Sequence, residues 1–525
     1  MIMKLAKRIL ALLLVLCFIG LALVGCSGKK NEGDENNGGS ENANGNTDAT
    51  ETETNEYGEP SFTGVVPVDD LDFEGEEITV LVRDSKISYR EWGKETTEDE
   101  LDEAVLMRNA AVEESLNVIM HQERVPTADY ATFSQQYNNL IIQDVTSDFH
   151  YYDVAANYAY CGAYPDVRDY AANLNDTETF PFFDFSLPCW NQAIVKNTTM
   201  NGRLHYVSGD VNLTLFDAAI VIWYNKTLYD EKKEPMDPEH MQEYALEGCW
   251  TYDDLYRWAA IFDDSNGVAG KQPDDTYGFA TPKYACAPHD AWPYAWDLEF
   301  IVTNPDGTHD FNIVGNSKAE EAFVKFRNLI EANGNCLEPS VDNFTAGCYV
   351  FWPSLIYSSE DANMKIREMD DTYGLLPMPK YDMDQEQYGT TTQDFYTLMT
   401  VIDHSTSTLP TKGKAVSAFL QLMTEESYTS VRGYYFNRII KPKYFGTDDS
   451  EGTVTKSIAL FDIIVANIEF EYWTIYSAQL NDIAWLWRDG FRDDVASLES
   501  AYISKESDFV DAIRGTDEWL GLRSE

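Results

Sequence analysis

The run Glu77-Ile78-Thr79-Val80-Leu81-Val82 is rich in β-branched residues, which predict a buried strand at the start of the folded chain. Helical periodicity follows over residues 101–116, and a second strand is predicted near residues 117–120. A helix over residues 130–142 and a strand over residues 152–156 complete the pattern. Strands that alternate with helices in this order predict a doubly wound α/β lobe with a parallel sheet.

The ends of these strands supply the first candidate site residues. Ligands of doubly wound sheets lie at the carboxyl ends of the strands. Arg83 follows the first predicted strand, and Tyr158 and Tyr160 follow the third. We therefore expect these three side chains to contribute to ligand binding.

A second series of elements predicts a second α/β lobe. Strands are expected over residues 202–207, 218–224 and 277–280, with a hairpin over 301–314 and an amphipathic helix over 318–332. A further helix is predicted to begin within Trp250–Leu255, where Thr251 and Asp254 have capping-box spacing. The chain contains no repeat of 20–50 residues, which argues against a solenoid.

The N-terminus predicts export. Three basic residues precede an apolar run over residues 9–19, which is typical of a secretory signal peptide. The tetrad Leu23-Val24-Gly25-Cys26 resembles the lipobox of bacterial lipoproteins and implies a signal peptide over residues 1–25 and a lipid on Cys26. A plain secretory signal with an incidental cysteine is the alternative. Residues 26–60 then form the lipid anchor and an acidic tether with too few apolar residues to fold.

Composition excludes several functions. The chain has 525 residues, 44% of them hydrophobic, and a net charge of −51, which repels nucleic-acid backbones. The cysteines beyond Cys26 and the seven histidines show no metal-site spacing, so we expect no metal, no cofactor and mostly buried free thiols. Motifs of serine hydrolases, zinc proteases and P-loop enzymes are absent from the sequence.

Four segments resemble a known family. They are residues 202–206 together with 221–228, the helix start at 250–255, residues 344–352, and the stretch Tyr373–Tyr381. Their order and spacing are similar to those of the extracellular (family 1) solute-binding lipoproteins of bacterial ABC sugar importers, which include maltose-binding proteins. Maltose-binding relatives carry Glu where the chain crosses between lobes, whereas Asp210 and Asp217 lie nearby in this sequence.

The resemblance implies a type II periplasmic-binding-protein-like fold, with two doubly wound α/β lobes joined by a hinge. We expect lobe 1 to comprise residues 73–195 and 340–385, and lobe 2 to comprise residues 196–339 and 386–525. It also implies a monomer, lipid-anchored on the outer face of a Gram-positive cell membrane. Such a protein captures a carbohydrate, expected to be an oligosaccharide, in the cleft between the lobes and delivers it to an ABC permease.

Sugars stack on aromatic rings through their C–H faces and bond polar groups through their hydroxyls. The candidates at positions expected to face the cleft, besides Arg83, Tyr158 and Tyr160, are Asp210, Trp292, Trp296, Trp352 and Trp473. We place Trp352 on the helix that returns to the first lobe. For each aromatic residue, packing in the core is the alternative role.

Two other functions remain open. A membrane-tethered glycoside hydrolase would need two carboxylates facing each other across the sugar. A ligand sensor for a membrane kinase would share the fold. A pair of carboxylates with raised pKa at the base of the cleft would favour hydrolysis, and aromatic residues without such a pair would favour binding.

Overall fold

The predicted strand around Val80 is the centre of the first sheet. In the computed structural model, β1 (Glu76–Asp84) lies between two parallel neighbours, β2 (Val118–Pro126) and β3 (Val154–Tyr158). The fourth strand, β10 (Thr397–Val401), pairs with β3 in the antiparallel sense, giving the order β10-β3-β1-β2. The predicted alternation of strands and helices over residues 76–158 is confirmed.

The structure describes residues 61–523 except 95, 128–129, 148, 165, 262–274, 282–286, 334–338, 357–364, 405–408, 441–444 and 446–451. The predicted signal peptide, Cys26 and the tether lie outside the described residues. The described residues belong to one compact unit. No helix among them is long and apolar enough to cross a membrane.

Helices bury both faces of the first sheet. Ile78, Val80 and Val82 pack into one hydrophobic cluster with residues of α3 and α15. Leu81 points to the opposite face and packs with residues of α4. Burial on both faces explains why β1 reads as a continuous apolar run rather than an alternating one. The helices of this first lobe are α2 (Lys86–Trp92), α3 (Glu100–Leu116), α4 (Tyr130–Thr146), α5 (Ala159–Gly162), α6 (Gln192–Thr198) and α15 (Leu409–Glu426).

The second lobe has a mixed four-stranded sheet. Its order is β5-β8-β4-β9, with β5 parallel to β8 and β4 antiparallel to both β8 and β9. The strands are β4 (Ile220–Asn225), β5 (Tyr277–Phe279), β8 (Tyr349–Leu355) and β9 (Tyr373–Leu376). The predicted strands at 218–224 and 277–280 are confirmed as β4 and β5.

Strand pairing divides the chain differently from the boundaries that we expected. We placed residues 340–385 in lobe 1, but β8 and β9 pair with β4 in the second sheet. We placed residues 386–525 in lobe 2, but β10 pairs with β3 and α15 packs on the first sheet. The chain therefore crosses between the sheets before β4, between β9 and β10, and again after α15.

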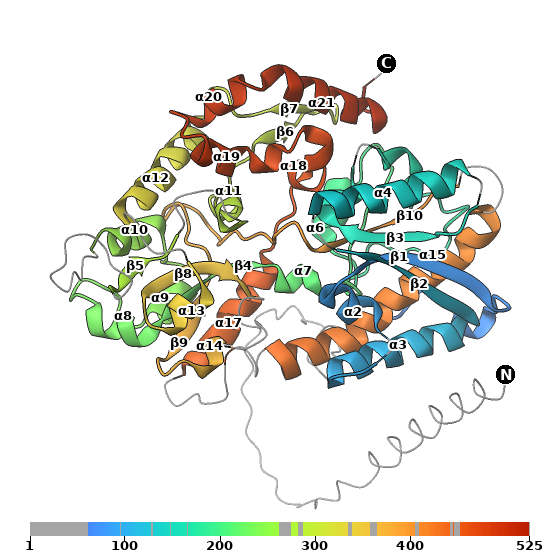
Figure 1. Cartoon of the computed structure of the whole chain (residues 1–525), viewed down its shortest axis with the longest axis horizontal. Helices are drawn as coiled ribbons and strands as arrows, with labels where there is room; N and C mark the ends of the chain where they lie inside the picture. The colour runs from blue at the N-terminus through green and yellow to red at the C-terminus, as the bar shows by residue number, and fades with distance from the viewer. Residues whose placement is uncertain are drawn as a thin grey trace, which may run out of the picture. The chain divides into compact units, whose positions relative to one another are not determined.

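Helices surround the second sheet, as Figure 1 shows. They are α7 (Thr214–Asp217), α8 (Lys226–Lys232), α9 (Met241–Leu246), α10 (Tyr252–Ile261), α11 (Trp292–Ala295), α12 (Ser317–Asn333), α13 (Val341–Thr345), α14 (Lys365–Glu368) and α17 (Thr453–Ala466). The predicted helices at 250–255 and 318–332 are confirmed as α10 and α12. The backbone N–H of Thr251 donates to Asp254 Oδ2 at 3.0 Å, which is one half of the predicted capping box, and the Thr251 hydroxyl donates to the same oxygen at 2.8 Å.

The C-terminal segment packs on a hairpin. The predicted hairpin is present as β6 (Ile301–Thr303) and β7 (His309–Phe311). Beside it lie α18 (Tyr472–Ile475), α19 (Leu486–Arg492), α20 (Leu498–Ile503) and α21 (Glu506–Trp519), shown in red in Figure 1. Short 3-10 turns at Ser477–Leu480 and Ile483–Trp485 connect α18 to α19.

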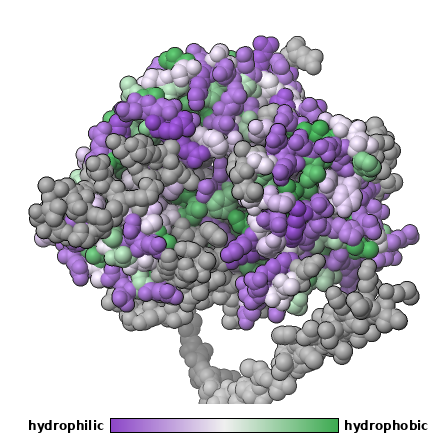
Figure 2. Space-filling view, viewed as in Figure 1, coloured by the Kyte–Doolittle hydropathy of each residue, from purple (hydrophilic) through white to green (hydrophobic). Residues whose placement is uncertain are grey.

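One predicted strand is not regular. Residues 202–207 form only isolated bridges, between Met200 and Arg203 and between Val207 and Met399. Hydrophilic side chains cover most of the described surface that is visible in Figure 2, as the net charge of −51 leads one to expect.

Candidate functional site

The carboxyl end of β3 meets a crossing segment and the C-terminal segment. Gln393 donates its backbone N–H to Ala218 O at 2.8 Å, and Ile220 donates to Thr391 O at 3.0 Å. These bonds fix the crossing segment, residues 390–396, against the start of β4. Tyr160 lies two residues after β3, at the carboxyl end of a parallel strand. The crossing segment meets the strand at this end, which is where ligands bind in doubly wound sheets.

Arg83 contacts both the crossing segment and Tyr158. Its guanidinium is buried and donates to Phe395 O at 2.7 Å and to Thr397 Oγ1 at 2.6 Å. It also lies over the ring of Tyr158, 3.9 Å from the ring centroid, and pairs with Glu91 at 3.8 Å. Arg83 therefore holds the crossing segment and Tyr158 in place, and its donors are directed at protein atoms.

Tyr160 stacks on a residue of the second lobe that the sequence did not single out. Its ring is parallel to the indole of Trp485, with an interplanar angle of 3° and 4.8 Å between centroids. The guanidinium of Arg488 lies over Trp485 at 4.4 Å. Trp485 belongs to the second lobe because α19, which follows it, packs on the turn Ala287–Ala291 and on α20.

Two carboxylates surround Arg488. Asp290 Oδ2 pairs with Arg488 Nη1 at 3.0 Å, whereas Asp290 Oδ1 is buried with no hydrogen-bond partner among the described residues. Burial raises the pKa of Asp290 well above its usual range, although Arg488 opposes the shift. Burial also raises the pKa of Asp394, which Arg488 and the indole N–H of Trp485 oppose.

These side chains border a small cavity between the elements of the two lobes. Its volume is about 30 Å³. Thr392 Oγ1 is buried there and, like Asp290 Oδ1, has no partner among the described residues. The cavity is lined by Tyr160, Ile220, Asp290, Tyr294, Thr391, Thr392, Gln393, Asp394, Thr474, Ser477, Ala484 and Trp485. We call this set the cleft site. One or two waters fill such a volume, so a sugar ring enters only after the walls separate.

Three of the expected ligand-stacking tryptophans lie in the core of the second lobe. Trp292 and Trp296 are fully buried and pack on each other with 5.0 Å between centroids. Trp473 is also buried and stacks on Tyr294 at 4.9 Å, so it supports a wall of the cleft site from behind. Packing accounts for all three positions, and we leave them out of the proposed site.

Trp352 and Asp210 lie elsewhere. Trp352 is in β8, opposite Trp223, and not on a returning helix as we expected. It is 5% exposed and packs on Phe344 at 5.4 Å. Asp210 borders a separate depression of about 500 Å³ and pairs with Arg432 at 3.4 Å. No residue that lines the cleft site lines this depression.

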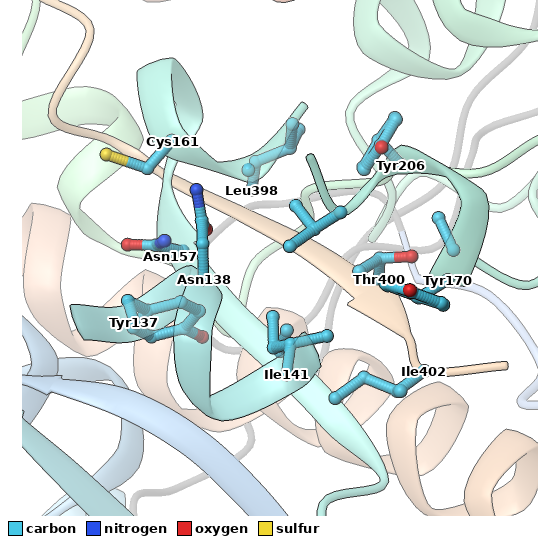
Figure 3. A pocket seen from close by; sticks show the side chains of 14 residues that line it. Tyr137, Asn138, Ile141, Asn157, Cys161, Tyr170, Tyr206, Leu398, Thr400 and Ile402 are labelled. Atoms are coloured by element: carbon cyan, nitrogen blue, oxygen red, sulfur yellow. The ribbon is translucent and has the colours of Figure 1, made fainter. Parts of the chain in front are cut away.

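A third cavity is enclosed within the first lobe. Figure 3 shows Asn138 and Asn157 close together in it, and its volume is about 10 Å³. Asn138 Oδ1, Asn157 Nδ2 and the hydroxyl of Tyr206 have no hydrogen-bond partner there among the described residues. This is room for one water molecule, which would satisfy these polar atoms, so the cavity is a structural feature and not a ligand site.

Metal chemistry receives no support from the described residues, because no three His, Cys, Asp or Glu side chains among them are grouped to hold an ion. Cys161 and Cys189 are buried, and Cys249 and Cys348 are partly exposed. Cys286 and Cys336 lie outside the described residues. Burial raises the pKa of Cys348, so this thiol is a weak nucleophile.

The two sheets, the crossings between them and a site at the strand ends define the class: a two-lobed α/β binding-protein fold. The sugar-binding protein MalE from the phytopathogen Xanthomonas citri matches with a TM-score of 0.55 and 12% identity, over 86% of this chain and 100% of that chain. This likeness shows that the chain has the MalE fold, as the sequence resemblance implied.

Other solved structures match at lower TM-scores. Maltose-bound MalE3 of T. maritima matches at 0.48 with 12% identity, over 84% of this chain and 100% of that chain. The cyclic alpha-maltosyl-1,6-maltose binding protein of Arthrobacter globiformis matches at 0.48 with 14% identity and the same coverage. No protein-family model matches the chain, and no curated protein does.

Proposed function

We propose that the protein is an extracellular solute-binding protein that captures a carbohydrate at the cleft site and delivers it to an ABC permease. The main support for the proposal is that aromatic and polar side chains lie together at the cleft site, where the two lobes meet. Tyr160 and Trp485 contribute stacked aromatic rings, and Asp290 Oδ1 and Thr392 Oγ1 are buried polar atoms in need of partners. A sugar ring supplies both an apolar face and hydroxyl donors.

The fold supports the same reading. The matched MalE of Xanthomonas citri is a sugar-binding protein. Proteins built this way bind in the cleft and close their lobes by hinge bending. In this chain Tyr160 and Trp485 come from opposite lobes and meet at the cleft site, so lobe movement changes access to it.

Isothermal titration calorimetry against a panel of maltose, maltotriose, maltotetraose, xylooligosaccharides, peptides and polyamines tests the proposal. We expect one or more sugars to bind, and Trp485→Ala to weaken that binding about tenfold or more, because a stacked aromatic ring contributes about 0.5–1.5 kcal/mol beyond its buried area. Tyr151→Ala is the matched control, since Tyr151 is an exposed aromatic residue outside the cleft site. Binding of peptides or polyamines without any sugar would refute the assignment.

Glycoside hydrolysis is the second candidate, because Asp290 and Asp394 are a pair of carboxylates with raised pKa at the base of the cleft. The guanidinium of Arg488 pairs with Asp290 at 3.0 Å and also opposes the rise in the pKa of Asp394, whereas a hydrolase needs its two carboxylates on either side of the sugar bond. This arrangement favours binding. Release of reducing ends from the bound oligosaccharide, abolished by Asp290→Asn, would establish hydrolysis instead.

We also propose that Cys26 carries the lipid and that the folded body works as a monomer at the outer face of the membrane. The lipobox-like tetrad Leu23-Val24-Gly25-Cys26 supports the anchor. Two acyl chains are sufficient to hold a protein stably on a bilayer. Labelled palmitate should enter the parent protein in a bacterial host but not Cys26→Ala, and release of both proteins into the medium would contradict the anchor.

A further inference from the structure

The C-terminal segment, residues 472–523, contacts both lobes, and we call it the strap. It reaches from α12, beside which α20 lies, to α6, beside which α18 lies (Figure 1). On the second lobe it is fixed to the hairpin, because α21 packs on β7 and Asp517 pairs with His309 Nδ1 at 2.6 Å. Four residues that line the cleft site belong to the strap: Thr474, Ser477, Ala484 and Trp485.

The strap also packs on the first lobe. The indole of Trp519 lies on the imidazole of His205, with 4.8 Å between the ring centroids, and 5.7 Å separates its centroid from the guanidinium of Arg168. Asn201 Nδ2 donates to Gly521 O at 3.1 Å.

Two further contacts continue this interface toward the cleft site. Arg168 Nη1 donates to Gln479 Oε1 at 3.2 Å. The ring of Tyr206 packs edge to face on Tyr476, with 6.0 Å between the centroids. We call the contacts of Tyr476, Gln479, Trp519 and Gly521 with the first lobe the joint.

The first-lobe side of the joint is attached to the first sheet itself. Thr400 of β10 donates its hydroxyl to His205 O at 2.7 Å. His205 Nδ1 lies 2.9 Å from Ala171 O, and Ala171 forms a β-bridge with Ile402, the residue after β10. When the first sheet moves away from the second lobe, His205 moves with it. Either the joint or the attachment of the strap to the hairpin must then break.

The joint is the weaker of these two attachments. His309 and Asp517 are fully buried, whereas Asn201 and Gly521 are exposed and Trp519 is partly exposed. Water competes for exposed hydrogen bonds, so they contribute less than buried charged ones. The hydroxyl of Tyr476 is buried at the joint with no hydrogen-bond partner among the described residues, and separation would hydrate it. The joint therefore opens first.

We propose that the strap is an interlobe restraint: the joint holds the lobes together beside the cleft site, and a ligand enters that site only when the joint opens. The part that concerns the ligand rests on the proposed function, whereas the restraint itself does not. Trp485 belongs to the strap and Tyr160 to the first lobe, so opening of the joint separates these two stacked rings. Trp519 does not line the cleft site, which makes it a positioning residue.

Interlobe distances measured by double electron–electron resonance test the restraint without any ligand. Spin labels attached to p-acetylphenylalanine leave the native cysteines unmodified. Met107 on α3 and Val324 on α12 are the labelling positions, because they lie on different lobes and are 59% and 48% exposed. Trp519→Ala removes the indole from the joint, and Trp519→Phe keeps an aromatic ring there. Asn201→Gly removes the side-chain donor and tolerates the φ of 50° at this exposed position.

We expect Trp519→Ala and Asn201→Gly each to raise the ratio of long to short interlobe distances roughly two- to tenfold, the equilibrium shift for one aromatic contact or one hydrogen bond. Trp519→Phe should stay closer to the parent distribution. Arg514→Ala is the matched control, because Arg514 is on the same helix, is 64% exposed and pairs with Glu518. Unchanged distances in Asn201→Gly and Trp519→Ala, or an equal shift in Arg514→Ala, overturn the restraint. If Trp519→Ala does not fold, Asn201→Gly decides.

The ligand arm uses maltotriose as the first probe and then any sugar that the calorimetric panel identifies. Stopped-flow association with Asn201→Gly should be roughly two- to tenfold faster than with the parent protein, because the rate of entry follows the population of the open joint. An unchanged association rate in a variant whose interlobe distances lengthen overturns the role of the joint in ligand entry. If no sugar binds the parent protein, the proposed function fails, whereas the distance measurements decide the restraint by themselves.

Discussion

Asp517→Asn should destabilise the protein more than any substitution on the nearby surface, because Asp517 is the centre of a buried hydrogen-bond network with His309 and Arg523. We call this network the clasp. Its carboxylate accepts from His309 Nδ1 at 2.6 Å, from the backbone N–H of His309 at 3.0 Å and from Arg523 Nε at 2.9 Å. Asp517 and His309 are both fully buried. The clasp fastens α21 to the hairpin β6–β7, and the ring of His309 stacks on Tyr472 at 3.9 Å.

The magnitude follows from the contacts. Removing one partner of a buried, hydrogen-bonded charge pair costs about 3–5 kcal/mol. Asparagine would keep one acceptor oxygen and turn an N–H₂ group toward the remaining donors of His309 and Arg523. For a folded body of roughly 450 residues, the entropy of unfolding is about 1 kcal/mol/K, so the melting temperature should fall by about 3–5 °C.

Proton linkage gives the sign of the pH dependence. Burial alone would raise the pKa of Asp517, but the hydrogen bonds from His309 and Arg523 outweigh burial and lower it. A carboxylate with a lowered pKa in the folded state stabilises the protein above its unfolded pKa of about 4, and this stabilisation is lost as the pH falls further. The difference in the free energy of unfolding between the parent protein and Asp517→Asn should therefore be largest at pH 7 and decrease below about pH 4.

Differential scanning calorimetry measures the shift, and hydrogen exchange should show lost protection in α21. Asp310→Asn is the matched control, because Asp310 also faces Arg523, at 3.7 Å, but is 64% exposed. An exposed pair of this kind contributes about 0–1 kcal/mol. Equal melting temperatures for Asp517→Asn and Asp310→Asn would refute the clasp.

Two further predictions concern buried charge. Burial, Glu471 and Asp297 raise the pKa of Glu469 from 4.5 to about 7, so the parent protein loses stability as the pH rises through this range. Glu469→Gln should therefore stabilise the protein at pH 8 by about 1–2 kcal/mol after allowance for solvent screening, and by nothing near pH 4, as urea unfolding at both pH values would measure. Arg83→Met should destabilise by about 3–5 kcal/mol, because it removes a cation that pairs with the buried carboxylate of Glu91 at 3.8 Å. Adding Glu91→Gln should restore part of that loss, and a purely additive double variant would contradict the coupling.

The first lobe could be predicted from the sequence because its signals are local. The run around Val80 is β-branched and buried on both faces, and the helices at 100–116 and 130–146 carry the right periodicity. The division of the chain between the lobes could not be predicted in this way. Nothing within Tyr349–Leu355 indicates whether that strand pairs with β1 or β4, since pairing is a property of the whole sheet.

The site residues were harder to predict because the residue type does not show whether a side chain is buried. Tyr158 and Tyr160 were predicted from the rule that ligands lie at strand ends, and of the two only Tyr160 lines the cleft site. Trp292, Trp296 and Trp473 are equally aromatic, but each packs against other rings of the core. Asp290 and Asp394 stand out only once burial and Arg488 are known.

Trp485 and Trp487 show why the sequence analysis did not select Trp485 as a candidate. They are two positions apart, at the junction of a 3-10 turn and α19, where side chains separated by two residues point in very different directions. Trp487 is fully buried and stacks on Phe326 with 5.9 Å between ring centroids, whereas Trp485 is partly exposed and contacts Tyr160 and Arg488. The sequence alone does not distinguish these two tryptophans. Only the direction in which the turn enters the helix decides that one completes the core of the second lobe and the other faces the first lobe.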